Sequence, residues 1–133
     1  MSHLPTVQSI YEDFGRGDVA AILSRLSDDV EWEYGNAESG VPWLKPRSGP
    51  AEVAKFFESL AAVEFTRFEP TVMLENGPIV VVLLDVALTV RATGRTVAEA
   101  HEVHLWTFGE QGRVTRFTHK TDTHQHWLAF TGG

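Results

Sequence analysis

The ionisable residues near the end of the chain have types and spacing that could support chemistry. Lys120 and Asp122 are two residues apart, so on an extended strand they would share one face. A carboxylate surrounded by apolar groups can act as a general base, whereas a neighbouring lysine favours its ionised form. Asp122 is therefore the first catalytic candidate. The alternatives are an ion pair with Lys120 or a cap of the turn at Thr123.

Two histidines lie in the preceding predicted strand. His101 is two residues before Val103 and would share the inner face of the sheet with it. Because histidine titrates near neutral pH, His101 could relay a proton to Asp122 across the sheet. His104 and Trp106 would then lie on the opposite, outer face of this strand.

The histidines near Asp122 also raise the question of a metal site. His124 and His126 could place two imidazoles on one side of an extended segment, and His119 is close in sequence. His119 has the opposite parity to Asp122, however, and would face away unless a bulge shifts the strand. No ligand-spacing motif, nucleophile elbow, phosphate loop or dinucleotide fingerprint is present. We therefore expect no metal and no cofactor.

Hydrophobic periodicity predicts the elements that would position these residues. Apolar residues recur at the i, i+3, i+4, i+7 spacing of buried helical stripes in residues 7–14, 19–26 and 53–60. Asp18 suits the N-cap of the second helix, and Pro50 suits the first position of the third. Strands are expected at residues 30–34, 64–75, 79–92, 96–108 and 113–122.

The connections between the strands predict how they are arranged. Pro70 places the second strand at an edge or a bend of the sheet. Glycine turns at residues 93–95 and 109–112 join the last three strands into an antiparallel meander. Three helices cannot cover both faces of such a sheet, so we expect it to curl around them. The predicted fold is a single α+β domain over residues 1–133, a cone of three N-terminal helices packed into a strongly curved antiparallel sheet.

Composition excludes several classes of partner. The 133 residues carry 11 basic and 18 acidic side chains, a net charge of −7 that opposes binding to nucleic acid or to an anionic membrane. No apolar run reaches membrane-spanning length, and no signal peptide is visible at the N-terminus. The chain has no cysteine. These features are consistent with a cytoplasmic protein.

Several motifs, taken in order, resemble a known family. The segments are YEDFGRGD at 11–18, SDDVEWE at 27–33, RSGP at 47–50 and HLWTF at 104–108. They are similar to the SnoaL-like, ketosteroid-isomerase-like family of the nuclear-transport-factor-like superfamily. The resemblance implies a cone with an apolar pocket and a homodimer formed through the convex sheet face. The family includes isomerases, cyclases, dehydratases and epoxide hydrolases, so the resemblance implies no single activity.

The resemblance also suggests which residues could react. The tyrosine and two aspartates of the steroid isomerases align with Ile10, Tyr34 and Val103, which argues against that mechanism. Cyclase and epoxide-hydrolase relatives place a catalytic aspartate on the last strand, where Asp122 stands. Lys120 occupies a position that is often aromatic in those relatives.

The resulting hypothesis is a cofactor-independent enzyme that acts by proton transfer on a small apolar cyclic or carbonyl compound. Asp122 would be the acid or base, and Tyr34 and His101 would assist it. The expected pocket residues are Trp32, Trp43, Val103 and Lys120. Trp43 stands in the long loop 35–50, which could cover a ligand. The alternatives are a non-catalytic protein that binds a small hydrophobic ligand and a purely structural dimerisation module.

Overall fold

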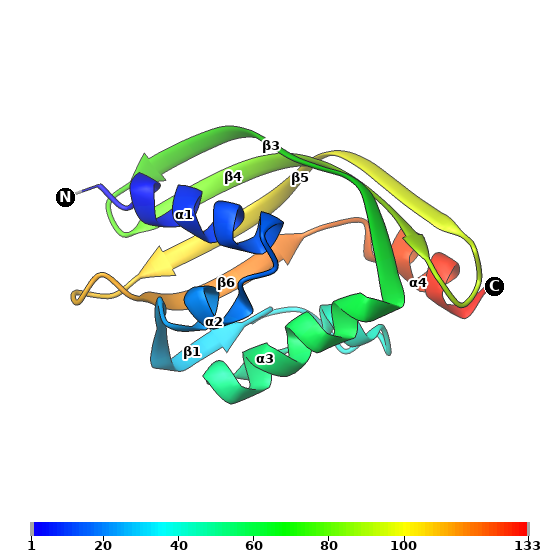
Figure 1. Cartoon of the computed structure of the whole chain (residues 1–133), viewed down its shortest axis with the longest axis horizontal. Helices are drawn as coiled ribbons and strands as arrows, with labels where there is room; N and C mark the ends of the chain where they lie inside the picture. The colour runs from blue at the N-terminus through cyan, green and yellow to red at the C-terminus, as the bar shows by residue number, and fades with distance from the viewer. Residues whose placement is uncertain (1, 133) are drawn as a thin grey trace.

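Four α-helices and six strands are found in residues 2–132, the part of the chain that the computed structural model describes (Figure 1). The helices are α1 (Leu4–Gly15), α2 (Val19–Leu23), α3 (Pro50–Ser59) and α4 (Thr123–Thr131). The strands are β1 (Leu26–Trp32), β2 (Arg47–Ser48), β3 (Val63–Asn76), β4 (Ile79–Val90), β5 (Thr96–Phe108) and β6 (Val114–Lys120). The loop before β2 contains a short 3-10 turn at Pro42–Leu44.

The strands form one sheet in the order β2-β1-β6-β5-β4-β3. The prediction that Pro70 marks an edge strand is confirmed, because β3 is the last strand of this order. Neighbouring strands are antiparallel except for β1 and β6, which run parallel. The expected all-antiparallel sheet is therefore wrong at that one pair, which no hairpin connects.

The curved sheet wraps around the N-terminal helices, and its concave face forms the core with them (Figure 1). Along β4, every second residue from Val80 to Val90 is buried. Val7 of α1 and Val53 of α3 are fully buried. Burial of these apolar side chains is the main force that holds the helices inside the sheet. The α+β cone is confirmed.

Several element boundaries differ from the prediction, among them that of the first strand, which was expected at residues 30–34 and spans Leu26–Trp32. The second helix ends at Leu23 instead of continuing to Leu26, because Leu26 begins β1 and pairs with Val114 of β6. Leu26 is buried as expected, but in a strand. The last strand ends at Lys120 and is followed by α4, a helix that the sequence analysis did not predict.

Candidate functional site

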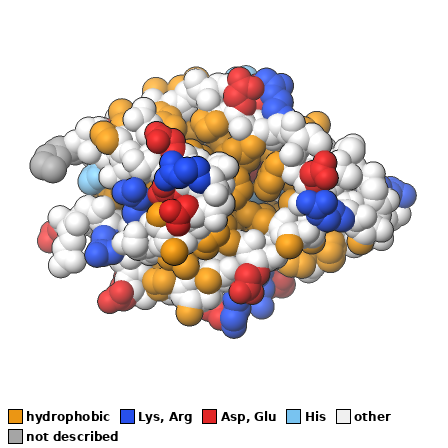
Figure 2. All heavy atoms as spheres, in the orientation of Figure 1, with side chains coloured by type: hydrophobic (Ala, Val, Ile, Leu, Met, Phe, Trp, Pro, Cys, Tyr) orange, Lys and Arg blue, Asp and Glu red, His pale blue; other side chains and the backbone are white. Residues whose placement is uncertain are grey.

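A cavity opens between the concave face of the sheet and the helices. It holds about 710 Å³ of atom-free space, which includes its mouth to solvent. Figure 2 shows this opening as a hollow edged by hydrophobic side chains, over the space that α1, α3 and β3 surround. The wall is largely aromatic, and its polar members are Tyr11, Glu102, His104, His119 and His126. Clefts of this kind are typical of small-molecule sites.

The side chains that β5 directs into the cavity differ from those predicted. Val97 and Glu99 point inward, but from Glu102 onward the even-numbered residues are the buried ones. The pairing with β4 shifts between Glu99 and Glu102, and His101 has a left-handed φ of 61°. This bulge reverses the parity of the strand.

The inner and outer faces of β5 are therefore exchanged after the bulge. His101 is exposed and Val103 faces outward, so their predicted placement on the cavity wall is wrong. His104 and Trp106, which were expected on the convex face, line the cavity instead.

The last strand shows the same kind of reversal. His104 pairs directly with His119, and residues opposite each other in an antiparallel pair share a face. His119 therefore faces the cavity, whereas Lys120, paired with Val103, is exposed on the other side. The expected pocket position of Lys120 is wrong, and Lys120 does not lie with Asp122 on one strand face because the strand ends there.

Asp122 is the N-cap of α4. Its Oδ1 accepts a hydrogen bond from the backbone N–H of Gln125 at 3.1 Å, and the residue is exposed and does not line the cavity. The prediction that it projects into the pocket is wrong, since the chain leaves the sheet two residues earlier. The alternative of a capping role next to Thr123 is the one that the geometry supports.

We expect Asp122→Ala to lower the free energy of unfolding by about 1 kcal/mol through loss of this cap. Asp122→Asn, which retains a capping oxygen, should remain close to the wild type. Urea denaturation followed by circular dichroism measures both variants. A loss of more than about 3 kcal/mol for Asp122→Ala would show that the residue does more than cap the helix.

The backbone after β1 separates Tyr34 from the pocket. Glu33 has a left-handed φ of 58°, which breaks the strand alternation, so that Trp32 and Glu33 are both buried. Tyr34 turns away and packs under the guanidinium of Arg116, 5.3 Å from its ring centroid. The predicted role of Tyr34 in the cavity is wrong, and Glu33, which was not predicted, takes the inward position.

The two tryptophans expected in the pocket do line it. Trp32 packs against Phe117 with ring centroids 4.2 Å apart. Trp43, from the loop before β2, donates a hydrogen bond from Nε1 to Nδ1 of His126 at 2.9 Å. This bond ties the loop to α4, so Trp43 both lines the cavity and anchors the loop.

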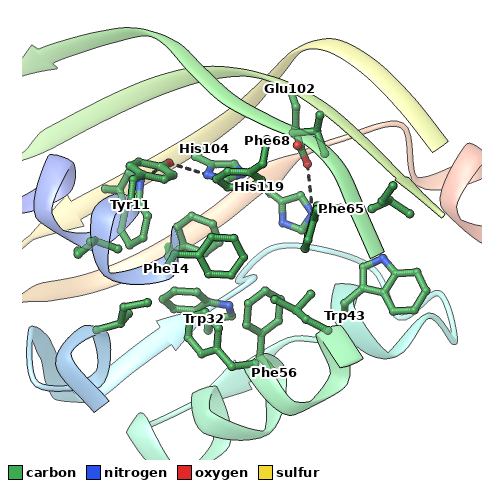
Figure 3. A pocket seen from close by; sticks show the side chains of 18 of the residues that line it. Tyr11, Phe14, Trp32, Trp43, Phe56, Phe65, Phe68, Glu102, His104 and His119 are labelled. Carbon is green, nitrogen blue, oxygen red and sulfur yellow. Dashed lines mark hydrogen bonds and ion pairs between the residues drawn. The ribbon is translucent and has the colours of Figure 1, made fainter. Parts of the chain in front are cut away.

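His119 occupies the most polar part of the cavity. Its Nδ1 lies 2.6 Å from Oε1 of the fully buried Glu33. Its Nε2 lies 3.6 Å from Oε1 of Glu102 (Figure 3). Glu33 is itself held by the side-chain amide of Asn36, which donates to Oε2 at 2.9 Å. The pair is thus fixed on the Glu33 side and free of a short hydrogen bond on the Glu102 side.

The surroundings shift the pKa values of both groups. Burial alone lowers the pKa of His119, but the nearby Glu33 carboxylate, aided by Glu102 and Glu99, raises it above the usual 6.5. Burial raises the pKa of the Glu102 carboxyl above 4.5, although His119 opposes the shift. A histidine whose pKa is raised by a buried carboxylate, next to a carboxyl whose pKa is raised by burial, is suited to acid–base work.

A second polar chain enters the cavity from α1. The indole N–H of Trp106 donates to Oη of Tyr11 at 3.2 Å. Tyr11 Oη lies 2.6 Å from Nδ1 of His104 (Figure 3). Burial raises the pKa of Tyr11 well above its usual range and, together with the charge of His119, lowers the pKa of His104 well below 6.5. Both groups are therefore neutral at physiological pH.

A metal-like cluster lies where β5 meets α4. Glu99, Glu102 and His126 offer ligand atoms within 4.8 Å of one another. However, the indole N–H of Trp43 can only donate, so Nδ1 of His126 must accept and the ring proton sits on Nε2. Nε2 then offers a hydrogen rather than a lone pair to an ion, and it contacts Thr121 at 3.0 Å and Glu99 at 3.4 Å. The hydrogen bonding therefore does not fit a metal.

The curved cone and the open cavity within it are those of a protein of the NTF2-like class. The chain belongs to the SnoaL-like domain family, whose model matches residues 7–117. Its fold is similar to that of an NTF2-like protein of unknown function from Burkholderia pseudomallei K96243, at 30% sequence identity and a TM-score of 0.85, covering 98% of this chain and 99% of that one.

Two further solved structures have the same fold at lower identity. TerC, co-crystallised with polyporic acid, is 24% identical with a TM-score of 0.80 over 97% of this chain and 98% of its own. A protein described as a candidate polyketide cyclase, from Xanthomonas campestris pv. campestris, is 22% identical with a TM-score of 0.76 over 96% of each chain. A comparison with curated proteins gave no match. Among the described residues, no helix is both long enough and apolar enough to cross a bilayer.

Most of the polar cavity residues escaped the sequence analysis. The sequence did contain a signal for two of them: His104 and His119 are histidines in strands otherwise rich in apolar or β-branched residues. Pairing them requires the register between β5 and β6, which the turn at residues 109–112 suggests but does not determine. Glu33 and Glu102 carried no comparable signal.

Proposed function

We propose that this protein is a cofactor-independent enzyme that moves a proton within a small, largely apolar cyclic carbonyl compound. The Glu33–His119 pair is the observation that carries the proposal. Glu33 orients Nδ1 of the buried imidazole, which leaves Nε2 directed toward the cavity and Glu102. A base held in this way at an apolar wall is suited to carbon acids, whose protons transfer slowly in water.

The proposed reaction needs no co-reactant. Neutral His119 takes a proton from the carbon next to the carbonyl, and the electrons of the broken C–H bond form the enolate. The resulting imidazolium is stabilised by Glu33, 2.6 Å away. It then returns the proton to the same carbon or to a conjugated one, which gives exchange or isomerisation. Glu102, 3.6 Å from Nε2, is placed to shuttle the proton between two positions.

Two structural neighbours support this class of compound. One was crystallised with polyporic acid, and another is described as a candidate polyketide cyclase. The aromatic wall of the cavity, with residues such as Trp32, Phe56 and Phe117, suits a flat ring system. We do not propose the steroid-isomerase mechanism, because the sequence resemblance aligns its three catalytic side chains with Ile10, Tyr34 and Val103.

A non-catalytic binding protein is the second candidate. It is favoured by the composition of the cavity wall, in which apolar side chains far outnumber polar ones. A binding protein would retain its ligand without turnover. The two functions are therefore distinguished by the rate of turnover and not by the affinity for the ligand.

Proton exchange in D₂O tests the proposal. The protein is incubated with 1-tetralone, 2-tetralone and related cyclic ketones, and loss of the α-proton signal is followed by NMR. We expect exchange above the buffer rate, and an at least ~100-fold fall in the catalysed rate for His119→Gln. His124→Gln, which alters an exposed histidine of α4, is the matched control.

Two results would contradict the enzyme hypothesis. If ketones raise the unfolding temperature but never exchange, the protein is a binder. If His119→Gln exchanges as fast as the wild type, the proton does not pass through this imidazole.

We propose further that the chain acts as one domain and forms a homodimer through the convex face of the sheet in the cytoplasm. Trp106 was expected on the outer face of the sheet but lines the cavity, so it does not contribute to such an interface. Val72, Leu74 and Ile79 of the β3–β4 hairpin are exposed apolar residues that such a contact could cover. Sedimentation at micromolar concentration would reveal a monomer if this is incorrect.

A further inference from the structure

The hydrogen-bond chain at the α1 side of the cavity fixes where one proton lies. Trp106 Nε1 can only donate, so the Tyr11 oxygen accepts from it at 3.2 Å. The Tyr11 hydroxyl must then place its own proton, and His104 Nδ1, at 2.6 Å, is its nearest partner. If Nδ1 carried a hydrogen, the hydroxyl proton would have no acceptor among residues 2–132. Tyr11 therefore donates and Nδ1 accepts.

The neutral state of His104 places the ring proton on the other nitrogen. Burial, together with the charge of His119, lowers the pKa of His104 well below 6.5, so the ring carries a single proton at neutral pH. With Nδ1 occupied as an acceptor, that proton lies on Nε2. The residue is only 8% exposed and lines the cavity beside Tyr11 (Figure 3).

This Nε2–H is an unsatisfied donor. Within residues 2–132 it has no hydrogen-bond partner, and it is not one of the fully buried unpartnered atoms of those residues, so it is open to the cavity that His104 lines. The ring lies 5.8 Å from the ring of His119, centroid to centroid, on the directly paired position of the next strand. A carbonyl oxygen at His104 would thus put its α-carbon within reach of His119.

We infer that His104 is the group that binds the carbonyl oxygen of the ligand, as a neutral donor whose tautomer is set by Tyr11 and Trp106. This inference rests on the proposed function only for the step in which His119 removes a proton. The ligand class, a ring compound with a hydrogen-bond-accepting oxygen, follows from the His104 donor alone. A neutral donor suits an oxygen that gains negative charge during the reaction, because it adds no fixed charge to the ground state.

Binding of a matched pair of compounds tests this assignment. 1-Tetralone and tetralin share the same ring skeleton, and only the ketone has an acceptor oxygen. We expect calorimetry to show tighter binding of 1-tetralone than of tetralin to the wild type. His104→Phe, which keeps an aromatic ring without the donor, should weaken 1-tetralone about tenfold and leave tetralin within about twofold.

Nitrogen NMR tests the tautomer directly and does not depend on the variant folding well. Long-range ¹H–¹⁵N correlation spectra of the wild type at neutral pH should show Nε2 of His104 protonated and Nδ1 unprotonated. Tyr11→Phe should give a mixture of tautomers. On addition of 1-tetralone the Nε2–H resonance should shift, and on addition of tetralin it should not.

Several results would overturn the inference. These are a proton on Nδ1 in the wild type, equal weakening of both compounds by His104→Phe, and absence of binding by both compounds at millimolar concentration. None of these depends on turnover. Failure of the exchange assay with intact ketone binding would reject the enzyme and leave the role of His104 standing.

Discussion

Glu33→Ala is expected to lower the free energy of unfolding by about 3–5 kcal/mol at pH 6. Glu33 is fully buried and pairs with His119 at 2.6 Å, so its removal leaves a buried imidazole without its counter-charge. Burial, which already lowers the pKa of His119, would then be opposed only by Glu102 and Glu99. We therefore expect the pKa of His119 to fall from above 6.5 toward lower values, measurable by NMR titration.

The pH dependence of this effect has a definite sign. In the wild type, the folded-state pKa of His119 is raised above the unfolded value of 6.5. Its contribution to stability is therefore complete below pH 6.5 and is lost as the pH rises through the folded-state pKa. The difference in stability between wild type and Glu33→Ala should narrow over that range. It should not vanish, since neutral His119 can still donate from Nδ1 to Glu33.

Two control variants separate charge from packing. Glu33→Gln keeps the size and an acceptor oxygen, so it should lower the pKa of His119 with a smaller loss of stability. Glu31→Ala, two residues earlier on β1, removes only an exposed ion pair with Arg116 and should change stability by less than about 1 kcal/mol. An unchanged His119 titration in Glu33→Ala would show that the pair is not the cause of the shift.

Phe117→Ala is expected to lower the free energy of unfolding by about 3–5 kcal/mol, which is among the largest effects for a single core residue. Phe117 lies on β6, is 4% exposed, and contacts the rings of Trp32 and Trp106 at centroid distances of 4.2 and 4.4 Å. Truncation removes the apolar ring that packs against both tryptophans. It also enlarges the cavity at its back wall, next to the ring of His104.

Urea denaturation monitored by tryptophan fluorescence and circular dichroism measures this loss. Phe117→Leu, which retains most of the volume, is the control and should cost less than about 1.5 kcal/mol. A change below about 1 kcal/mol for Phe117→Ala would mean that the aromatic cluster collapses into the space and is not rigidly packed.

Much of the fold could be predicted from the sequence because its signals are local. Pro50 begins α3 as expected, the residues of β5 match their predicted range, and the edge position of β3 follows from Pro70. The family resemblance added the cone shape. Trp32 and Trp43 reached the cavity because large aromatic residues on its inner elements have few other places to be buried.

The ionisable residues of the site were not predictable in the same way, because side chains alternate along a strand and a shift of one residue exchanges the two faces. By itself, the sequence determined most element types, their order and an apolar interior, but not the C-terminal helix α4. Only the tertiary structure decided which charged groups enter that interior. The bulge at His101 brought Glu102 and His104 inside, and the left-handed backbone at Glu33 brought its carboxylate to His119. Such backbone conformations are unfavourable for residues other than glycine and persist only where the surrounding packing imposes them.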